Sequence, residues 1–331
     1  MSASSAVTDE PTIEIGPGRT TRSVRSSRRG RPPKRSAVSD STAIGRNKWI
    51  PYLFSAPSII MVSLILAYPV IWGIVQSFFR RELGGATEFV GVQNYVEMFS
   101  DPSFWDALGK TGIFVFGCLA LTLVLGLVFA FALNRALGAL RFLRAITIAP
   151  YIVSSVAAAV MFRILFNGDF GLINRVLMFF GLDGLPWLSD PTLAMVVVIF
   201  AQTWSDLPLV ILLLLAGLQA IDKSYLEAAL VDGASPFQRA RHITIPLLSP
   251  QIAISMIWTS YSTLTGLGVV LALTGGGPLR GTQILPIEMY QTAFISFQQN
   301  QALAIGTFIL VLNALLTLIY LRVSRGYGVE D

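Results

Sequence analysis

The chain has 331 residues, of which 53% are hydrophobic and 13% are charged, and its mean hydropathy is +0.65. Soluble domains carry about 25% charged residues, so this composition excludes an ordinary cytosolic enzyme and predicts that lipid surrounds most of the chain. The single cysteine, Cys118, and the single histidine, His242, exclude an intrachain disulfide and argue against a zinc or haem site.

The first 48 residues carry the net positive charge of the chain. They hold ten Lys or Arg and four Asp or Glu, which leaves a net charge of −1 on the remaining residues. Ser, Arg, Gly and Pro dominate this segment, and its apolar surface is too small to offset the chain entropy, which predicts a disordered cytoplasmic tail at 1–48. Residues 29–35 are similar to a short hook for the DNA minor groove. A solvated tail near anionic lipid is the favoured interpretation, so no nucleic-acid partner is expected.

Six apolar stretches are long enough to cross a bilayer, which takes about 20 residues each. They cover 52–78, 111–133, 145–166, 192–218, 250–273 and 302–321. Gly, Pro or small polar residues interrupt each stretch, as is tolerated where neighbouring helices cover the freed backbone groups. The sequence therefore predicts an all-α polytopic membrane protein, with six transmembrane helices in a domain at 49–325 and a short cytoplasmic tail at 326–331.

The distribution of Lys and Arg predicts which side of the membrane each loop faces. With the N-terminus inside, the inside segments hold 18 of the 24 Lys and Arg residues; these segments are 1–49, 134–144, 219–249 and 322–331. Positive charge is enriched in cytoplasmic loops, so both termini are predicted to be cytoplasmic. The outside segments are then 80–110, 167–191 and 274–301, which are too short for domains and are predicted to cap the bundle and form a docking surface.

The predicted fourth span carries the clearest intramembrane carboxylate, Asp206, two residues before Pro208. An Asp at the bilayer centre costs about 2.5–3.5 kcal/mol on insertion scales, so it is expected to face the bundle interior. Gln202 and Asp206 share one helix face, while Trp204 points away. Two interpretations stay open: a polar binding cluster, helped by the carbonyl that Pro208 frees near Trp204, or a structural hydrogen bond from Asp206 to a neighbouring helix.

Residues 222–250 form a cytoplasmic loop whose sequence predicts two short helices. Ser224 and Glu227 have the spacing of a capping box, which predicts a helix starting near Tyr225. Gly233 suits the left-handed turn that ends such a helix.

The second short helix of this loop is predicted from another capping box, Ser235 with Gln238. It should run towards Ile243 and end near Pro246, because the residue before a proline disfavours the helical conformation. An apolar stripe on the first helix needs a protein surface to cover it, either the chain's own bundle or a partner; the stripe consists of Leu226, Ala229 and Leu230.

The predicted fifth span has two neighbouring faces of small polar and aromatic residues. One face holds Ser255, Thr259, Ser262 and Gly266, and the adjacent face holds Trp258, Tyr261 and Thr265. Either these residues let helices approach closely, or they line a pathway through the bundle.

The loop at 222–250 resembles the EAA loop of binding-protein-dependent ABC importer permeases. The residues that carry the resemblance are Glu227-Ala228-Ala229, Asp232-Gly233-Ala234, Ile243-Thr244-Ile245-Pro246 and Pro250. In that family the loop is the coupling helix that docks into a cytoplasmic ATPase. Residues 89–95, 273–278 and 289–294 are similar to outside loops of the carbohydrate branch, which includes maltose, trehalose and glycerol-3-phosphate permeases. The resemblance extends over nearly all of 49–325.

The resemblance implies a type I ABC importer permease (MetI-like) fold in the cytoplasmic membrane of a prokaryote. It also implies a second homologous permease, two ABC ATPase subunits and an extracytoplasmic solute-binding protein as partners. No Gly-x-x-x-x-Gly-Lys-Ser/Thr motif occurs in the sequence, so ATP and Mg²⁺ are expected on the partner ATPase and no cofactor on this chain.

Two sets of candidate site residues follow, the first from the resemblance and the second from the polar residues of the predicted fourth and fifth spans. The residues for coupling to the ATPase are Glu227, Ala228, Ala229, Asp232, Gly233, Ala234, Ile243 and Pro246. The candidate substrate path consists of Gln202, Trp204, Asp206, Thr259, Tyr261 and Ser262.

A neutral sugar is the favoured solute, because a phosphorylated one such as glycerol-3-phosphate calls for a buried Arg or Lys, and the sequence places none at mid-membrane. Two other classes of protein fit less well. An enzyme needs a base beside a nucleophile, whereas His242 lies in the coupling loop. A channel or secondary transporter calls for several intramembrane ionisable groups, and would transport without an ATPase.

Overall fold

The structure is a computed structural model that describes residues 50–81, 87–135, 147 and 149–325. The predicted tails at 1–48 and 326–331 lie outside the described residues, as does most of the predicted inside segment 134–144. The chain divides into two units, Met1–Pro57 and Ser58–Asp331, and the helical bundle belongs to the second.

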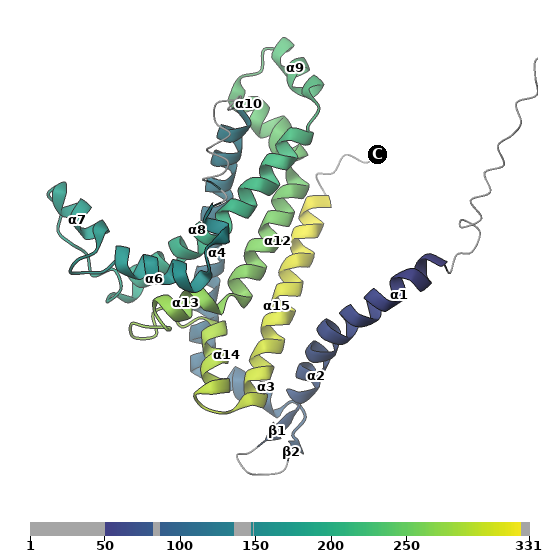
Figure 1. Cartoon of the computed structure of the whole chain (residues 1–331), viewed down its shortest axis with the longest axis vertical. Coiled ribbons are helices and arrows are strands. Elements are labelled where there is room, and N and C mark those ends of the chain that lie inside the picture. Colours follow the sequence, from purple (N-terminus) through teal and green to yellow (C-terminus); the bar gives the residue numbers. More distant parts are fainter. Residues whose placement is uncertain (1–49, 82–86, 136–146, 148, 326–331) are drawn as a thin grey trace, which may run out of the picture. The chain divides into compact units, whose positions relative to one another are not determined.

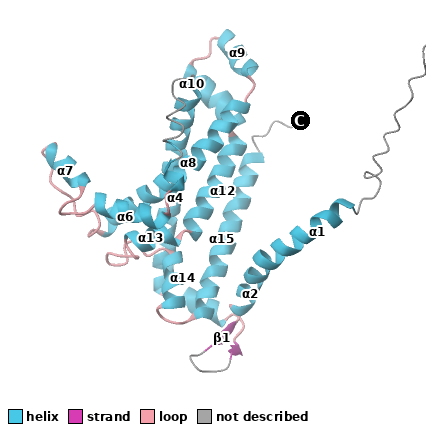
Figure 2. Ribbon diagram, in the orientation of Figure 1, coloured by secondary structure: helices cyan, strands magenta, loops and turns pink. Residues whose placement is uncertain are grey.

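Helices make up most of the described chain (Figure 2). The first apolar region holds α1 (Ile50–Val62), the π-helical segment η2 (Ser63–Ala67) and α2 (Tyr68–Gln76). An antiparallel hairpin of β1 (Phe79–Arg81) and β2 (Thr87–Phe89) follows. The next helices are α3 (Gln93–Ser100), α4 (Pro102–Arg135), α6 (Ser155–Leu165), α7 (Leu172–Phe179) and α8 (Pro191–Ala220). The loop after α8 holds α9 (Lys223–Val231), α10 (Pro236–Arg239), η3 (Ala240–Thr244) and α11 (Ile245–Leu247). The chain continues with α12 (Ser249–Thr265), α13 (Leu267–Leu273), α14 (Leu285–Phe294) and α15 (Gln299–Arg325).

Among the described residues, four helical stretches are long and apolar enough to cross a membrane. They are Phe54–Gln76, Pro102–Asn134, Pro191–Ala220 and Gln299–Ser324. A fifth candidate is the pair Pro236–Leu247 and Ser249–Thr265, which is bent by 69°. The prediction of an all-α polytopic fold is confirmed, and these stretches correspond to five of the six predicted spans.

The predicted span 145–166 is interrupted at Ser154. Ser154 has an extended backbone, with ψ of 140°, and α6 begins only after it and runs for 11 residues. A residue with such a backbone at the N-cap position ends the preceding turn and starts a new helix. At 1.5 Å per residue α6 by itself is too short to span a bilayer.

The predicted fifth span, 250–273, is also interrupted, at Gly266. This residue separates α12 from α13 with a non-helical ψ of 86°. A Cβ at this position would lie 2.2 Å from the carbonyl oxygen of Ser262, so the break accepts glycine alone among the common residues.

The core of the second unit is a bundle in which α4, α8, α12 and α15 run side by side (Figure 1). α4 packs chiefly against α8, and α12 packs against both of them and against α15. Two glycines of α4 lie in this contact, where an added Cβ would come within 2.7 Å of Ile199 Cδ1 at Gly117 and 2.8 Å of Val210 Cγ1 at Gly126. Small residues let transmembrane helices approach closely, so the α4–α8 contact depends on both.

The loops predicted to face opposite sides lie at opposite ends of this bundle. α9 and α10, from the predicted inside segment, lie at one end, while α3 and α14, from predicted outside segments, lie at the other (Figure 1). At the α14 end, Asn300 Nδ2 donates a hydrogen bond of 2.8 Å to the carbonyl oxygen of Gln76, which ties α2 to the start of α15.

Candidate functional site

Three side chains from α8 and α12 form a closed ring of hydrogen bonds in the bundle interior. Gln202 Nε2 donates to Asp206 Oδ2 at 2.9 Å and to Ser262 Oγ at 3.0 Å. Ser262 Oγ in turn donates to Asp206 Oδ1 at 2.8 Å. Both carboxylate oxygens are therefore paired, which is how a buried carboxylate can be held away from water.

Helical spacing explains why two of these residues meet. Gln202 and Asp206 are four residues apart on α8, so their side chains are neighbours on one face. They are 4% and 5% exposed, and Ser262 reaches them from α12 across the helix contact. The prediction that Gln202 and Asp206 share one face of the helix is thus confirmed.

Several polar atoms near this ring have no hydrogen-bond partner among the described residues. They include the Gln202 Oε1 amide oxygen and the Trp258 Nε1 indole nitrogen, both buried; the indole lies beside the Asp206 carboxylate but outside the geometry of a hydrogen bond. An unpaired buried polar group costs about 1–3 kcal/mol, so such groups are expected to be satisfied by water, a solute or a partner. Trp258 belongs to the α12 face that was predicted either to pack against a helix or to line a pathway. The sequence does not show that its indole nitrogen lacks a partner, because this depends on how α12 is rotated against α8.

The other three predicted path residues lie elsewhere. Trp204 packs edge-to-face on Phe162 of α6, with ring centroids 5.9 Å apart, within an apolar cluster away from the carboxylate. Thr259 is buried in the helix contact. Tyr261 is 51% exposed and lines a cavity of about 540 Å³ between α12, α14 and α15. The structure therefore joins Gln202, Asp206 and Ser262 by hydrogen bonds in which Trp204, Thr259 and Tyr261 take no part.

The coupling loop has the two predicted helices, but the first of them begins earlier than predicted, at Lys223. Asp222 caps α9, because its side chain accepts from the backbone N–H of Ser224 at 2.9 Å, and the predicted capping box of Ser224 with Glu227 is not formed. Asp caps a helix as well as Ser does, and it stands two residues earlier. The hydrogen bonds from Ser224 also lower the pKa of the Asp222 carboxyl.

The turn and the second helix follow the prediction more closely. Gly233 has a φ of +75°, which confirms the left-handed turn. Ser235 and Gln238 form the predicted capping box at the start of α10.

The second helix ends at Leu247, one residue beyond Pro246 and close to the predicted end. The helix passes through Pro246 into α11, and the 69° bend follows at Leu248. The wider π-helical turn of η3 comes immediately before, and a turn of this kind accommodates a residue that cannot donate its N–H.

The outer surface of the coupling loop has exposed apolar side chains among polar and charged ones. Of the predicted coupling residues, Glu227, Ala228, Asp232 and Gly233 are exposed, Ala229 is buried, and Ala234, Ile243 and Pro246 are half-buried. Four large apolar side chains beside them are exposed: Tyr225, Leu230, Val231 and Phe237. Of these, only Leu230 belonged to the predicted stripe, because a two-helix pattern does not reveal which face the bundle leaves open.

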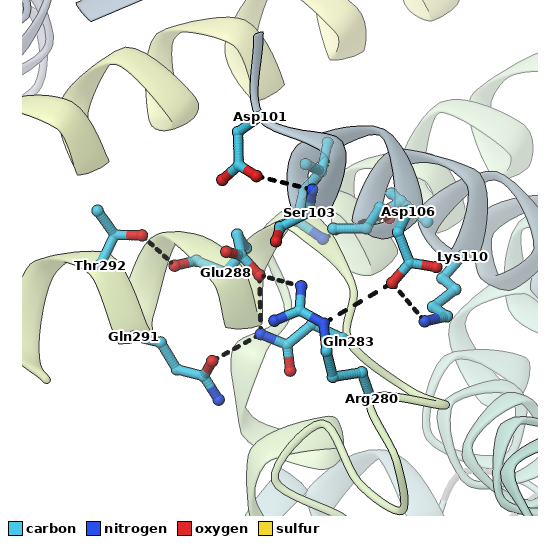
Figure 3. Close-up of polar contacts among 12 residues, drawn as sticks. Asp101, Ser103, Asp106, Lys110, Arg280, Gln283, Glu288, Gln291 and Thr292 are labelled. Carbon is cyan, nitrogen blue, oxygen red and sulfur yellow. Dashed lines mark hydrogen bonds and ion pairs between the residues drawn. The ribbon is translucent and has the colours of Figure 1, made fainter. Parts of the chain in front are cut away.

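A second polar network lies at the opposite end of the bundle and has no counterpart in the sequence-based predictions. Arg280 lies between two acidic side chains, with Nη2 3.0 Å from Glu288 Oε2 and Nε 3.8 Å from Asp106 Oδ2 (Figure 3). Gln283 Nε2 donates to Glu288 Oε2 at 2.9 Å and to Gln291 Oε1 at 2.6 Å. The network ties the loop before α14 to the start of α4.

Comparison with known proteins gives consistent matches over most of the chain. Residues 122–329 match the family described as "Binding-protein-dependent transport system inner membrane component". The chain is 35% identical to the trehalose/maltose transport system permease protein MalF of Thermococcus litoralis over 285 residues, which cover 85% of this chain and 95% of that protein.

Two further relatives are named for solutes that carry a charge. The sulfoquinovosyl glycerol permease SmoG of Agrobacterium fabrum is 32% identical, over 84% of this chain and 91% of that protein. The sn-glycerol-3-phosphate permease UgpA of the same organism is 32% identical, over 83% of this chain and 94% of that protein. A crystal structure of a bacterial ABC transporter that imports the acidic polysaccharide alginate matches in fold, with a TM-score of 0.71 and 22% identity over 84% of this chain and 95% of that one.

Proposed function

Because the chain belongs to the family of binding-protein-dependent transport system inner membrane components, we propose that it forms half of the translocation pathway of an ABC importer for a neutral sugar. It is a carbohydrate-type ABC permease subunit and not an enzyme; in this family the ATPase is a separate subunit. The neutral solute, the residues that contact it and the orientation of the chain are the proposed part.

The observation that supports a neutral solute is the ring of Gln202, Asp206 and Ser262. It places a carboxylate in the bundle interior with donors and acceptors around it, and Gln202 Oε1 remains free to accept a hydrogen bond. Sugar hydroxyls both donate and accept, so they suit such a site. A phosphate, sulfonate or uronate would meet the negative charge of Asp206 in a medium of low dielectric, where like charges repel strongly.

The apolar surface of the coupling loop supports docking to an ATPase. Exposed Tyr225, Val231 and Phe237 surround the EAA residues at the predicted cytoplasmic end. An apolar patch of this kind on a loop outside the bilayer marks a protein interface. In the proposed complex, this chain and a second homologous permease each contact one of two ATPase subunits, which bind ATP and Mg²⁺.

The proposed orientation has both termini and the coupling loop in the cytoplasm of a prokaryote, with α3 and α14 outside. An extracytoplasmic solute-binding protein then docks on the outer loops. ATP-driven closure of the ATPases moves the coupling loops together and switches the bundle between inward-facing and outward-facing packings.

The test is reconstitution of the complete complex with its binding protein in lipid vesicles. ATPase activity and uptake are measured with a neutral disaccharide such as trehalose or maltose, with glycerol-3-phosphate and with sulfoquinovosyl glycerol. We expect the neutral disaccharide to stimulate both activities. Stimulation by the anionic solutes alone would contradict the assignment to a neutral sugar, and solute uptake by this chain without an ATPase would indicate a secondary transporter.

A further inference from the structure

A groove runs along the bundle beside the coupling loop and lies apart from the Gln202–Asp206–Ser262 ring. It is a cavity of about 530 Å³ between η3, α11 and α12 on one side and the last turns of α15 on the other. Its residues segregate along its length. Arg241, Ser249 and Ser324 lie at the end towards the coupling loop, and Ala253, Met256 and Ile319 lie deeper along the helices.

The polar end of the groove holds a basic side chain and a hydroxyl group that lack protein partners among the described residues. Arg241 is exposed and makes no ion pair among the described residues. Ser249 Oγ is buried and has no hydrogen-bond partner in the part of the chain that the structure describes. The sequence contains no Asp or Glu at 233–287 or 289–329, which include every element that lines the groove. No carboxylate of these elements competes for Arg241.

The deeper part of the groove suits a hydrocarbon chain. Ile319 is 54% exposed. The hydroxyl of Tyr320 is hydrogen-bonded to Ser260 Oγ at 2.9 Å, so the part of Tyr320 that lines the groove is its aromatic ring. α15 is long and apolar enough to cross a membrane, and α12 belongs to the bent pair that is the fifth candidate span. An apolar channel with a basic end at the cytoplasmic boundary of a bundle matches a phospholipid that has an anionic headgroup.

We propose that this groove binds an anionic phospholipid of the cytoplasmic leaflet, with its headgroup phosphate on Arg241 and Ser249 and an acyl chain along Ala253, Met256 and Ile319. The proposal rests on the proposed orientation of the transporter. The lipid would bridge the coupling segment and α15, and would thereby stabilise one position of η3 relative to the bundle.

The experiment uses the complete complex, reconstituted in vesicles of phosphatidylglycerol with phosphatidylethanolamine or in vesicles of phosphatidylcholine alone. Lipids that remain bound after extraction are counted by native mass spectrometry, and sugar-stimulated ATPase activity is measured in both vesicles. The variants are Arg241→Gln, which removes the charge, and Ile319→Trp, which fills the groove at an exposed position. The matched control is Arg322→Gln, which removes an exposed charge from α15 outside the groove.

We expect about fivefold less bound phosphatidylglycerol in Arg241→Gln, as follows from the loss of one basic residue near an anionic headgroup, and a similar loss in Ile319→Trp. Arg322→Gln should retain the lipid. Equal retention in all three variants, or equal loss in Arg241→Gln and Arg322→Gln, would overturn the proposal.

Two other occupants have their own outcomes. Inorganic phosphate added to phosphatidylcholine vesicles should not restore the activity that phosphatidylglycerol gives, and restoration would replace the lipid by a free anion. A cysteine at Ile319 that forms a crosslink to the second permease would show that a protein covers the groove. If no sugar stimulates the complex in any vesicle, the proposed function is wrong. The number of bound lipids still tests whether the groove binds a phospholipid.

Discussion

At the scale of single residues, the carboxylate of Asp206 decides whether the polar ring serves transport. Asp206→Asn keeps the size of the side chain and one acceptor for Ser262 Oγ but removes the charge. We expect the complex to assemble normally and the apparent affinity for sugar in transport to fall about tenfold, since hydrogen bonds to charged groups are worth roughly 1–2 kcal/mol more than neutral ones. Tyr261→Phe, on another face of α12, should leave this affinity unchanged. Failure of Asp206→Asn to assemble, or wild-type affinity, would assign Asp206 to helix packing.

The sequence contained enough to place two members of this ring but not its closure. Gln202 and Asp206 follow from helical spacing, and the cost of an intramembrane charge directs them inward. Ser262 was expected on a polar face of α12, yet its hydrogen bonds depend on how α12 is rotated and shifted against α8. The packing of Trp204 on Phe162 could not be predicted either, because it depends on the position of α6.

At the scale of elements, Gly233 sets the angle between α9 and α10. Its φ of +75° is strained for any residue with a Cβ, although a Cβ there would have nothing within 4 Å. Gly233→Val should therefore misalign the two short helices, so that ATPase binding and transport fall together while the membrane helices still insert. Binding of the ATPase is measured by co-purification. Gly181→Val is the matched control, with a φ of +77° and equal space in a predicted outside loop; normal ATPase binding in Gly233→Val would remove the coupling assignment.

The helix boundaries show which local signals are sufficient. The capping box at Ser235 and the left-handed Gly233 were predicted correctly because both are decided within four residues. Two boundaries were not: Asp222 competes with Ser224 for the same cap, and Ser154 breaks an apolar run. The helix end near Pro246 was predicted to within one residue. Hydropathy defines the spans but carries no information on breaks within them.

At the scale of the whole molecule, the contact of α4 with α8 holds the bundle together. Gly126→Leu would drive a side chain into Val210 and Leu214, whose atoms lie 2.8 and 3.2 Å from an added Cβ. Overpacking of this kind costs about 1–3 kcal/mol, so we expect a lower unfolding temperature in detergent together with loss of assembly. Gly109→Ala, on the same helix with nothing within 4 Å of an added Cβ, is the control and should be neutral or stabilising. Equal unfolding temperatures in both variants would show that the α4–α8 contact is not critical.

The 69° bend at Leu248 has a mechanical consequence. It joins the coupling segment to α12 without a loop, so the two helical segments move as one rigid body. A force on the coupling segment then rotates α12 about the bend. Ser262 lies 13 residues beyond Ser249 on α12, which corresponds to a lever arm of about 20 Å. A rotation of about 10° about the bend would displace Ser262 by about 3.5 Å. That displacement exceeds the 2.8 and 3.0 Å lengths of its hydrogen bonds to Asp206 and Gln202, so a small tilt of the coupling arm is enough to open the ring at the far end of the lever.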